Sequence, residues 1–262
     1  MSNNFPSYSG LFKSTKRRLL KLEKIAQKRN AKLSDEDSFL FLIVGNINLR
    51  INTMFHLMES GIIDGVYPLQ RTLFEMQLAF EAYSLADDKQ RFLKLYFDKK
   101  NLESFRKVEK LIKADSLYSQ IRFNDEEKLL ASKYMEEATE AVKSIAGPKV
   151  NKTWYELASN KSVYELSKEY NSELEYFLCY DEPSNWVHPQ RLDQSMGTNF
   201  DFYIQPAYFT FIIGSLRYSI KYLVDDIAFI AEKIEIVESD PLYKYGEAMG
   251  KFDLKLQKLI LG

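Results

Sequence analysis

The sequence predicts an all-α protein: a single-domain helical bundle of about eight helices, with a long loop between the last long helices. Ten Gly and seven Pro are few for 262 residues, which favours long helices over many tight turns. Hydrophobic residues make up 45% of the chain, enough for a sizeable core. Apolar residues recur at helical spacing in several long segments. We therefore expect one domain over 1–262, with a basic N-terminal helix (1–33), a core (34–236) and a C-terminal helix (237–262).

The first predicted helix, residues 7–31, is strongly basic. Its apolar stripe is narrow, and Glu23 is the one acid among the cations between Lys13 and Lys32. Such a face is typical of a solvated helix docked on a bundle, but it would also attract nucleic acid or anionic lipid. The candidate nucleic-acid-binding residues are Lys16, Arg17, Arg18, Lys21, Lys24 and Lys28.

Two apolar helices are expected next. Ser34, followed by acidic residues, is typical of a helix start, and the second helix should run to about Ser60. The short segment 61–65 predicts an antiparallel third helix, with Pro68 in its first turn and its end near Ala86. Polar residues interrupt the apolar segments 39–58 and 203–224, so we expect core helices and no membrane insertion.

The rest of the chain predicts further helices. Segments 90–113 and 124–145 are charged, and should form a protruding hairpin or cover the bundle edge. After a break at Gly147-Pro148, helices are expected at 151–157, 162–180, 206–235 and 241–261. Between them, 180–203 is the longest segment without helical periodicity, and long ordered loops often carry function.

The third helix carries an unusual charge pair. Arg71 and Glu75 lie one turn apart on a face that also holds Phe74 and Leu78. Such a pair is either a structural ion pair at a helix contact or the floor of a polar site. The solvated stripe of this helix should be formed by Gln70, Gln77, Glu81 and Ser84.

The following loop gathers groups that could perform chemistry. Tyr180, Ser184 and His188 lie at four-residue intervals beside Trp186, and His188 is one of only two histidines. Histidine exchanges protons near neutral pH, which makes His188 a candidate catalytic group. The alternative is a hydrogen-bonded packing residue.

These residues together resemble a known family. Arg71 and Glu75 in a central helix, then Trp154, then Tyr180, Ser184 and His188, are similar to the signature of the bacterial DUF5677 family of helical proteins, over roughly residues 35–230. The resemblance implies that the third helix and the loop meet in one place. It implies no particular activity.

A second pattern is Arg50 followed by His56, which resembles the Arg-to-His motif of HEPN ribonucleases, all-α proteins common in toxin and phage-defence systems. The resemblance implies RNA cleavage without a metal, with His56 as the base and Arg50 stabilising the phosphorane charge. The alternative is two polar residues on a mostly buried helix.

Other classes of function are disfavoured by the sequence. The net charge of −1 argues against a globally basic nucleic-acid binder. Cys179 is the single cysteine, so no disulfide framework or cysteine metal cluster is expected; we expect a buried, inert thiol and a reducing cytoplasm. No phosphate loop or zinc-protease motif occurs, and the N-terminus lacks signal-peptide features. We expect a cytoplasmic protein without a cofactor or metal.

Two hypotheses follow. In the first, the protein is HEPN-like or defence-associated and binds or cuts RNA: Arg71 holds phosphate, His188 or His56 moves the proton, and the basic helix attracts the backbone. In the second, Arg71, Glu75 and His188 form a structural network in a non-catalytic module that binds another protein or forms a homodimer. Arg50 or His56 is expected to approach the polar centre formed by Arg71, Glu75, Tyr180, Ser184 and His188.

Overall fold

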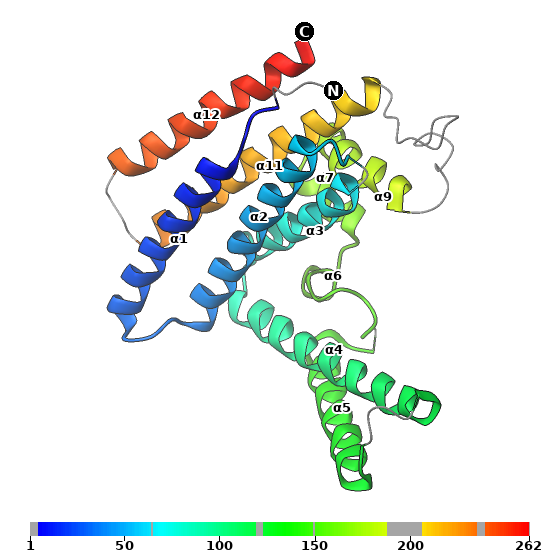
Figure 1. The fold of residues 1–262 in the computed structure, drawn as a ribbon. Coiled ribbons are helices and arrows are strands. Elements are labelled where there is room, and N and C mark those ends of the chain that lie inside the picture. The colour runs from blue at the N-terminus through cyan, green and yellow to red at the C-terminus, as the bar shows by residue number, and fades with distance from the viewer. Residues whose placement is uncertain are drawn as a thin grey trace, which may run out of the picture. The chain divides into compact units, whose positions relative to one another are not determined.

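The protein is all-α, as predicted. The computed structural model describes residues 5–63, 65–118, 123–148, 150–187, 206–234 and 239–261, and these ranges contain helices, turns and no strand (Figure 1). The chain forms two compact units: unit 1 comprises Met1–Phe80 and Tyr164–Gly262, and unit 2 comprises Glu81–Val163. The expectation of a single domain stays a prediction.

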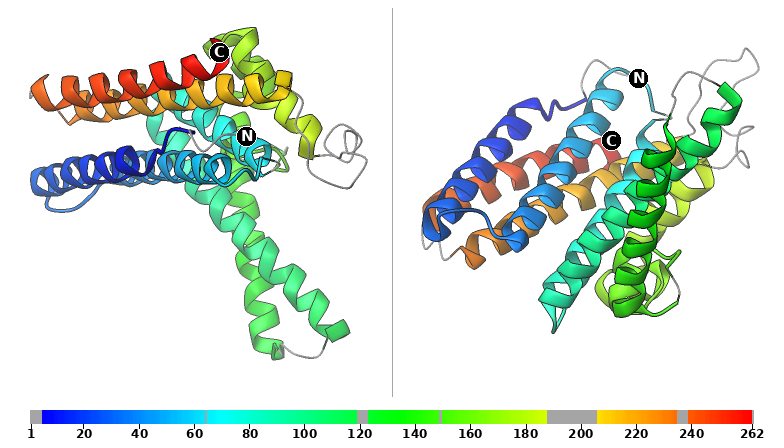
Figure 2. Two further views of the ribbon diagram at one scale, coloured as in Figure 1. Left: turned by 45° about the horizontal axis from the view of Figure 1, so that its top comes forward. Right: turned by 90° about the horizontal axis from the view of Figure 1, so that it is seen from below.

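Unit 1 contains the candidate residues of both hypotheses. Its helices, including two that cross a unit boundary (α3 and α7), are α1 (Ser9–Asn30), α2 (Asp35–Glu59), α3 (Val66–Ser84), α7 (Val163–Tyr170), α8 (Glu173–Tyr176), the π-helix η1 (Phe177–Asp181), α9 (Glu182–Val187), α11 (Pro206–Lys233) and α12 (Ser239–Leu261). The bounds of α1, α2 and α3 agree closely with those predicted from the sequence. Figure 2 shows α1 beside α2, and α12 running along α11.

Helix α2 is a core helix of unit 1. Ile47, Ile51, Met54 and Phe55 are almost completely buried. The helix begins as predicted: the Ser34 hydroxyl accepts a hydrogen bond from the Asp37 backbone N–H, in a reciprocal capping box. Within the described part of the chain, α2 is the one helix long and apolar enough to cross a membrane. Half of that apolar stretch is buried inside the protein.

The packing of α11 on α3 makes one prediction about the exposed face of α3 wrong. Gln70 and Gln77 were expected to face solvent, but they are 0% and 3% exposed. The Ser219 hydroxyl donates to Oε1 of Gln70 (3.1 Å), and Nε2 of Gln77 donates to Oδ1 of Asp226 (3.2 Å). These two glutamines are buried because Ser219 and Asp226 of α11 provide hydrogen-bond partners for them.

The predicted helix at 162–180 is divided into three. The helix is interrupted at Asn171, and the Ser172 hydroxyl caps the next helix by accepting a hydrogen bond from the Glu175 N–H at 3.2 Å. Helical structure then continues past Tyr180 to Val187, so residues 180–187 are helical where the sequence predicted a loop, and 188–203 lie outside the described residues.

Unit 2 is built on a helical hairpin. Helices α4 (Lys89–Tyr118) and α5 (Asp125–Ala146) pack against each other, and α6 (Trp154–Ser159) packs on α4. Its apolar core is formed by Leu95, Leu102, Ala138, Val142 and Leu157. The ring of Trp154, one of the family-like residues, contacts Phe92 and Tyr96 inside this unit, with centroids 5.2 and 4.9 Å apart.

Candidate functional site

The polar centre predicted from the sequence is partly assembled in unit 1. Nε of Arg71 donates to Oε1 of Glu75 at 3.4 Å, one turn further along α3. The Arg71 guanidinium carbon lies 5.2 Å from the centre of the Tyr180 ring, which η1 supplies. Such a distance is typical of a cation–π contact. The segments around 71 and 180 therefore do meet.

This group is open to solvent. The Arg71 and Glu75 side chains are 29% and 31% exposed, whereas the neighbouring Phe74 ring is fully buried. Phe74 contacts Tyr180 with ring centroids 6.0 Å apart, so a buried ring packs against the tyrosine that Arg71 contacts. An arginine so placed is held in position but can still be reached by a ligand.

Ser184 lies one turn after Tyr180, and its hydroxyl is already used. Its Oγ donates to the Tyr180 carbonyl oxygen. The residues between them pass from the π-helix η1 into α9, and π-helical turns are frequent at functional sites. Ser184 therefore acts on the backbone of this turn, which carries the tyrosine beneath Arg71.

Trp186 packs α9 against Tyr67 of α3 and Tyr208 of α11. The Trp186 ring stacks on Tyr67 and meets Tyr208 edge-on, with centroids 5.2 Å apart in each pair. Its Nε1 donates to Oε1 of Glu182 at 3.0 Å. His188 lies outside the described residues, so its place in the centre stays a prediction.

Arg50 and His56 make their described contacts along α2. Nη1 of Arg50 donates to Oδ1 of Asn46 at 3.3 Å, and burial lowers the pKa of the Arg50 guanidinium. Nδ1 of His56 lies 3.8 Å from a carboxylate oxygen of Glu59, and the imidazole is 59% exposed. No contact between described residues joins either side chain to Arg71, and the approach of Arg50 or His56 to the polar centre, which includes His188, stays a prediction.

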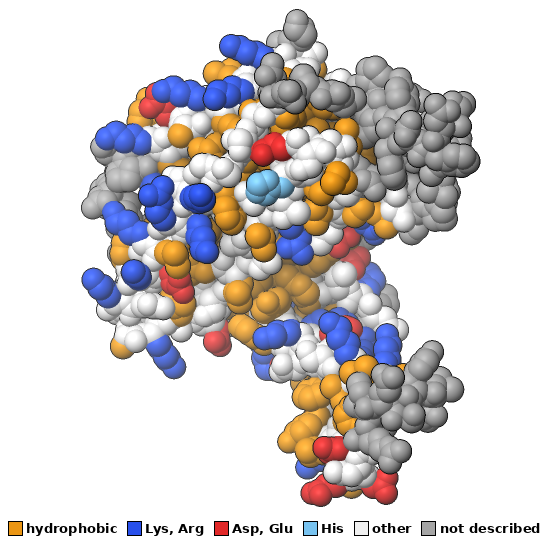
Figure 3. Space-filling model, viewed as in Figure 1, with side chains coloured by type: hydrophobic (Ala, Val, Ile, Leu, Met, Phe, Trp, Pro, Cys, Tyr) orange, Lys and Arg blue, Asp and Glu red, His pale blue; other side chains and the backbone are white. Residues whose placement is uncertain are grey.

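The basic residues of α1 form an exposed surface, which we call the basic face. It comprises Lys13, Lys16, Arg17, Lys21, Lys24, Lys28 and Arg29. Figure 3 shows Lys and Arg side chains gathered over α1. Arg18 differs, because it is partly buried with its guanidinium 5.3 Å from the Tyr245 ring centre. Burial lowers the pKa of Arg18, although Tyr245 acts in the opposite direction.

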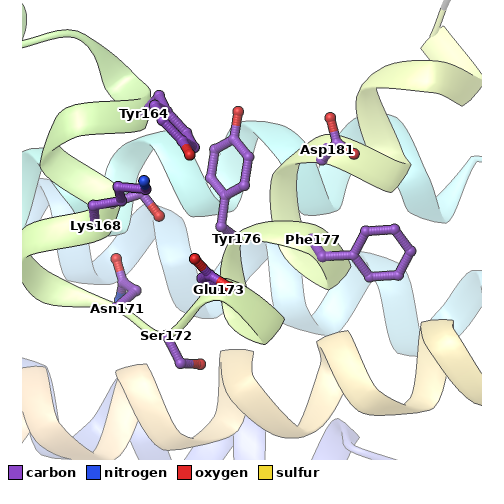
Figure 4. Close-up of a pocket in the computed structure, with 9 residues that line it drawn as sticks. Tyr164, Lys168, Asn171, Ser172, Glu173, Tyr176, Phe177 and Asp181 are labelled. Atoms are coloured by element: carbon purple, nitrogen blue, oxygen red, sulfur yellow. The ribbon is translucent and has the colours of Figure 1, made fainter.

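A surface pocket of about 300 Å³ lies beside the polar centre, and the sequence did not indicate it (Figure 4). One wall carries Tyr164, Ser167, Lys168 and Asn171, which share a face of α7 and the turn after it. The opposite wall carries Ser172, Glu173, Tyr176, Phe177 and Asp181 from α8 and η1. We call this the α7–η1 pocket.

Tyr176 connects this pocket with the polar centre. Its ring lies 5.3 Å from that of Tyr164 and 5.4 Å from that of Tyr180. Its pKa is raised, first by burial and then by the Asp181 carboxylate, while Arg71 acts to lower it. Tyr176 therefore lines the pocket and also contacts Tyr180, the tyrosine that lies against Arg71.

The structure bears on two kinds of site, a reactive cysteine and a metal centre. Cys179 is completely buried, and burial raises the pKa of its thiol well above the usual range, so the sulfur stays protonated at neutral pH. Within the described ranges, no three His, Cys, Asp or Glu side chains are grouped in a way that could hold a metal ion.

Comparison with known protein families matches residues 37–202 to one family, over more than half of the 262-residue chain. The match includes most of α2 and all of α3, the polar centre, the pocket and unit 2. Comparisons with curated proteins and with solved structures found no match. The chain therefore belongs to DUF5677, a family of unknown function.

Proposed function

We propose that this protein binds RNA and that the basic face of α1 contacts the phosphate backbone. The observation that carries the proposal is the row of exposed cations on one side of α1. The helix has 22 residues and is about 33 Å long, so a row of several phosphates could lie along it. Lysine and arginine bind phosphate largely by charge, so the contact would be independent of base sequence.

The rest of the chain favours a local contact over a general one. The protein has 36 Lys and Arg against 37 Asp and Glu, so its net charge does not attract nucleic acid. A concentration of positive charge on one helix directs the backbone to that helix. Binding should therefore weaken steeply with salt, because each phosphate contact releases counterions.

The polar centre would cut the bound RNA without a metal. Arg71 would hold the scissile phosphate, since among the described residues its only hydrogen bond comes from Nε, and its terminal nitrogens are suited to phosphate. His188 would take the proton of the ribose 2′-hydroxyl, whose oxygen attacks the phosphorus while the 5′-oxygen leaves and gains a proton. A HEPN-like role in phage defence would depend on this cleavage.

Binding is tested by removing four charges from α1. A Lys16→Ala, Arg17→Ala, Lys21→Ala, Lys24→Ala variant should lose about 10- to 100-fold in affinity for single-stranded RNA near 0.1 M salt. The slope of log K against log salt should flatten by about 3. The matched control removes four exposed lysines of α4 (Lys94, Lys100, Lys107 and Lys110) and should bind nearly as wild type. Equal losses in both variants would reject α1 as the contact.

Cleavage is tested with His188→Ala and Arg71→Ala on end-labelled RNA. Loss of cleavage with unchanged melting temperature and retained RNA binding supports the catalytic assignment. If wild-type protein binds RNA but never cuts it, the cleavage half of the proposal is rejected.

A second candidate function is a non-catalytic interaction module. The observation that favours it is a pair of exposed leucines on α2, Leu42 and Leu49, which are 55% and 51% exposed. They lie seven residues apart and so share a helix face that could pack on a second copy or another protein. Leu42→Glu with Leu49→Glu should abolish any self-association seen by sedimentation, and a wild type that is monomeric at all concentrations excludes the homodimer.

A further inference from the structure

We propose that the α7–η1 pocket binds a small organic cation: an ammonium or guanidinium group carried on a short apolar chain. This proposal is independent of RNA binding, because it concerns a different surface with a different charge. The basic face of α1 attracts anions, whereas the pocket presents carboxylates and aromatic rings.

The shape of the pocket suits such a ligand. Its volume of about 300 Å³ is at the lower end of the range for small-molecule sites. Residues spaced three and four apart on α7 form one wall, and the helix restart after Ser172 supplies the other. Figure 4 shows Tyr164 and Lys168 from α7 facing Tyr176 and Glu173 from α8.

The charges of the pocket favour a cation. Glu173 and Asp181 contribute two exposed carboxylates, and Lys168 contributes one ammonium group. Tyr164, Tyr176 and Phe177 supply ring surface, and the face of an aromatic ring attracts cations. A phosphate or carboxylate ligand would instead have to lie beside two negative side chains.

The protein itself shows that a cation fits here. Nζ of Lys168 lies 4.7 Å from the centre of the Tyr164 ring, in cation–π geometry. The Tyr164 hydroxyl oxygen, acting as a hydrogen-bond acceptor for the ammonium, raises the pKa of Lys168, and Glu173 adds to the effect. Lys168 is exposed and its stem is flexible, so it can leave this position when a ligand cation arrives. Lys168 is therefore an internal competitor for the site.

The pocket also contains an unused polar group. Ser167 is 1% exposed, and its hydroxyl has no hydrogen-bond partner within the described part of the protein. Buried hydroxyls are usually paired, and an unpaired one in a pocket wall is commonly satisfied by a ligand or water. An ammonium or guanidinium group in the pocket could donate a hydrogen bond to this hydroxyl oxygen.

The decisive experiment is Lys168→Ala, since its sign separates a cation site from an anion site. Binding of agmatine and of cadaverine is measured by calorimetry at low salt. Removing the internal competitor should strengthen binding about two- to fivefold. Lys251→Ala is the matched control: Lys251 is an exposed lysine of α12, paired with Glu247 at 2.7 Å, and its removal changes the net charge equally. The control should bind as wild type.

Two further variants test the walls. Asp181→Asn should weaken binding about two- to fivefold, whereas Glu247→Gln, with the same change in net charge, should have no effect. Tyr164→Leu removes ring surface from a half-exposed position, and it should weaken binding similarly without changing the melting temperature.

The source of the cation is separated by a third probe, Nα-acetyl-lysine amide, which carries the side chain as a protein would present it. Stronger binding of this probe than of cadaverine assigns a protein side chain, and the reverse assigns a free amine. The proposal is overturned if wild-type and Lys168→Ala proteins bind none of the three probes at millimolar concentration, or if Lys168→Ala weakens binding. Neither result would affect the proposal of RNA binding, which rests on the basic face of α1.

Discussion

Helices α1 and α2 lie side by side in unit 1 and have similar lengths, 22 and 25 residues, yet they differ in how many side chains they bury. Helix α2 buries ten side chains and holds the unit together. Helix α1 buries few and exposes a row of cations. Stability and surface charge are therefore separated between adjacent helices. Variants of α2 should change folding, whereas variants of the basic face should change binding.

Phe55→Ala on α2 should have the largest effect on folding. Phe55 is 1% exposed, and its ring contacts those of Tyr8 and Phe252 with centroids 5.1 and 5.2 Å apart. The cavity should lower the free energy of unfolding by about 3–5 kcal/mol in urea denaturation. Leu49→Ala, on the exposed side of the same helix, should change it by less than about 0.5 kcal/mol. Similar losses in both variants would contradict the assignment of a buried face.

Asn48→Ala should come next, because Asn48 ties the two helices together. The Tyr8 hydroxyl donates to Oδ1 of Asn48 at 3.0 Å, and Nδ2 donates to the Phe12 carbonyl at 3.4 Å. Burial raises the pKa of Tyr8, which keeps this hydroxyl protonated as a donor. We expect a loss of about 1–3 kcal/mol by denaturation.

Its control is Asn46→Ala, since the exposed Asn46 side chain bonds within α2, to Leu42. If Asn48→Ala with Tyr8→Phe costs as much as the two single changes added together, the two groups are not coupled.

Ser34→Ala should have a smaller effect, because it removes a cap and no packing. The Ser34 hydroxyl donates to Asp37 at 2.7 Å and accepts the Asp37 N–H at 3.0 Å. The expected loss is about 1 kcal/mol, read from the melting temperature. Ser60→Ala is the matched control, since Ser60 ends the same helix through its backbone N–H only. An equal effect of the two would show that the capping box contributes nothing.

Substitutions on α1 should cost least. Arg18→Met removes a cation from the Tyr245 ring and should lower stability by about 0.5 kcal/mol. Lys21→Met, on the exposed side, should leave stability unchanged within about 0.3 kcal/mol while it reduces RNA affinity. A destabilising Lys21→Met would mean that the basic face has a structural role.

Much of the helical fold was predictable because helix signals are local. The Ser34 cap and the apolar spacing of α2 each depend on residues within one or two turns. The meeting of Arg71 with Tyr180 was anticipated through the family signature, although periodicity alone did not place the two together. The α7–η1 pocket was missed because its walls come from two helices whose relative angle depends on the break before Ser172.

The amino-acid order was sufficient for the helix starts, the cation-rich face of α1 and membership of DUF5677. The amino-acid order wrongly predicted solvent exposure for Gln70 and Gln77, because a polar face of a helix is solvated unless another helix packs on it. The side chains that pack there are Ser219 and Asp226, each 149 residues further along the chain than its glutamine partner. Local patterns specify how a segment coils, but burial depends on which distant segment packs against it, and this only the three-dimensional fold decides.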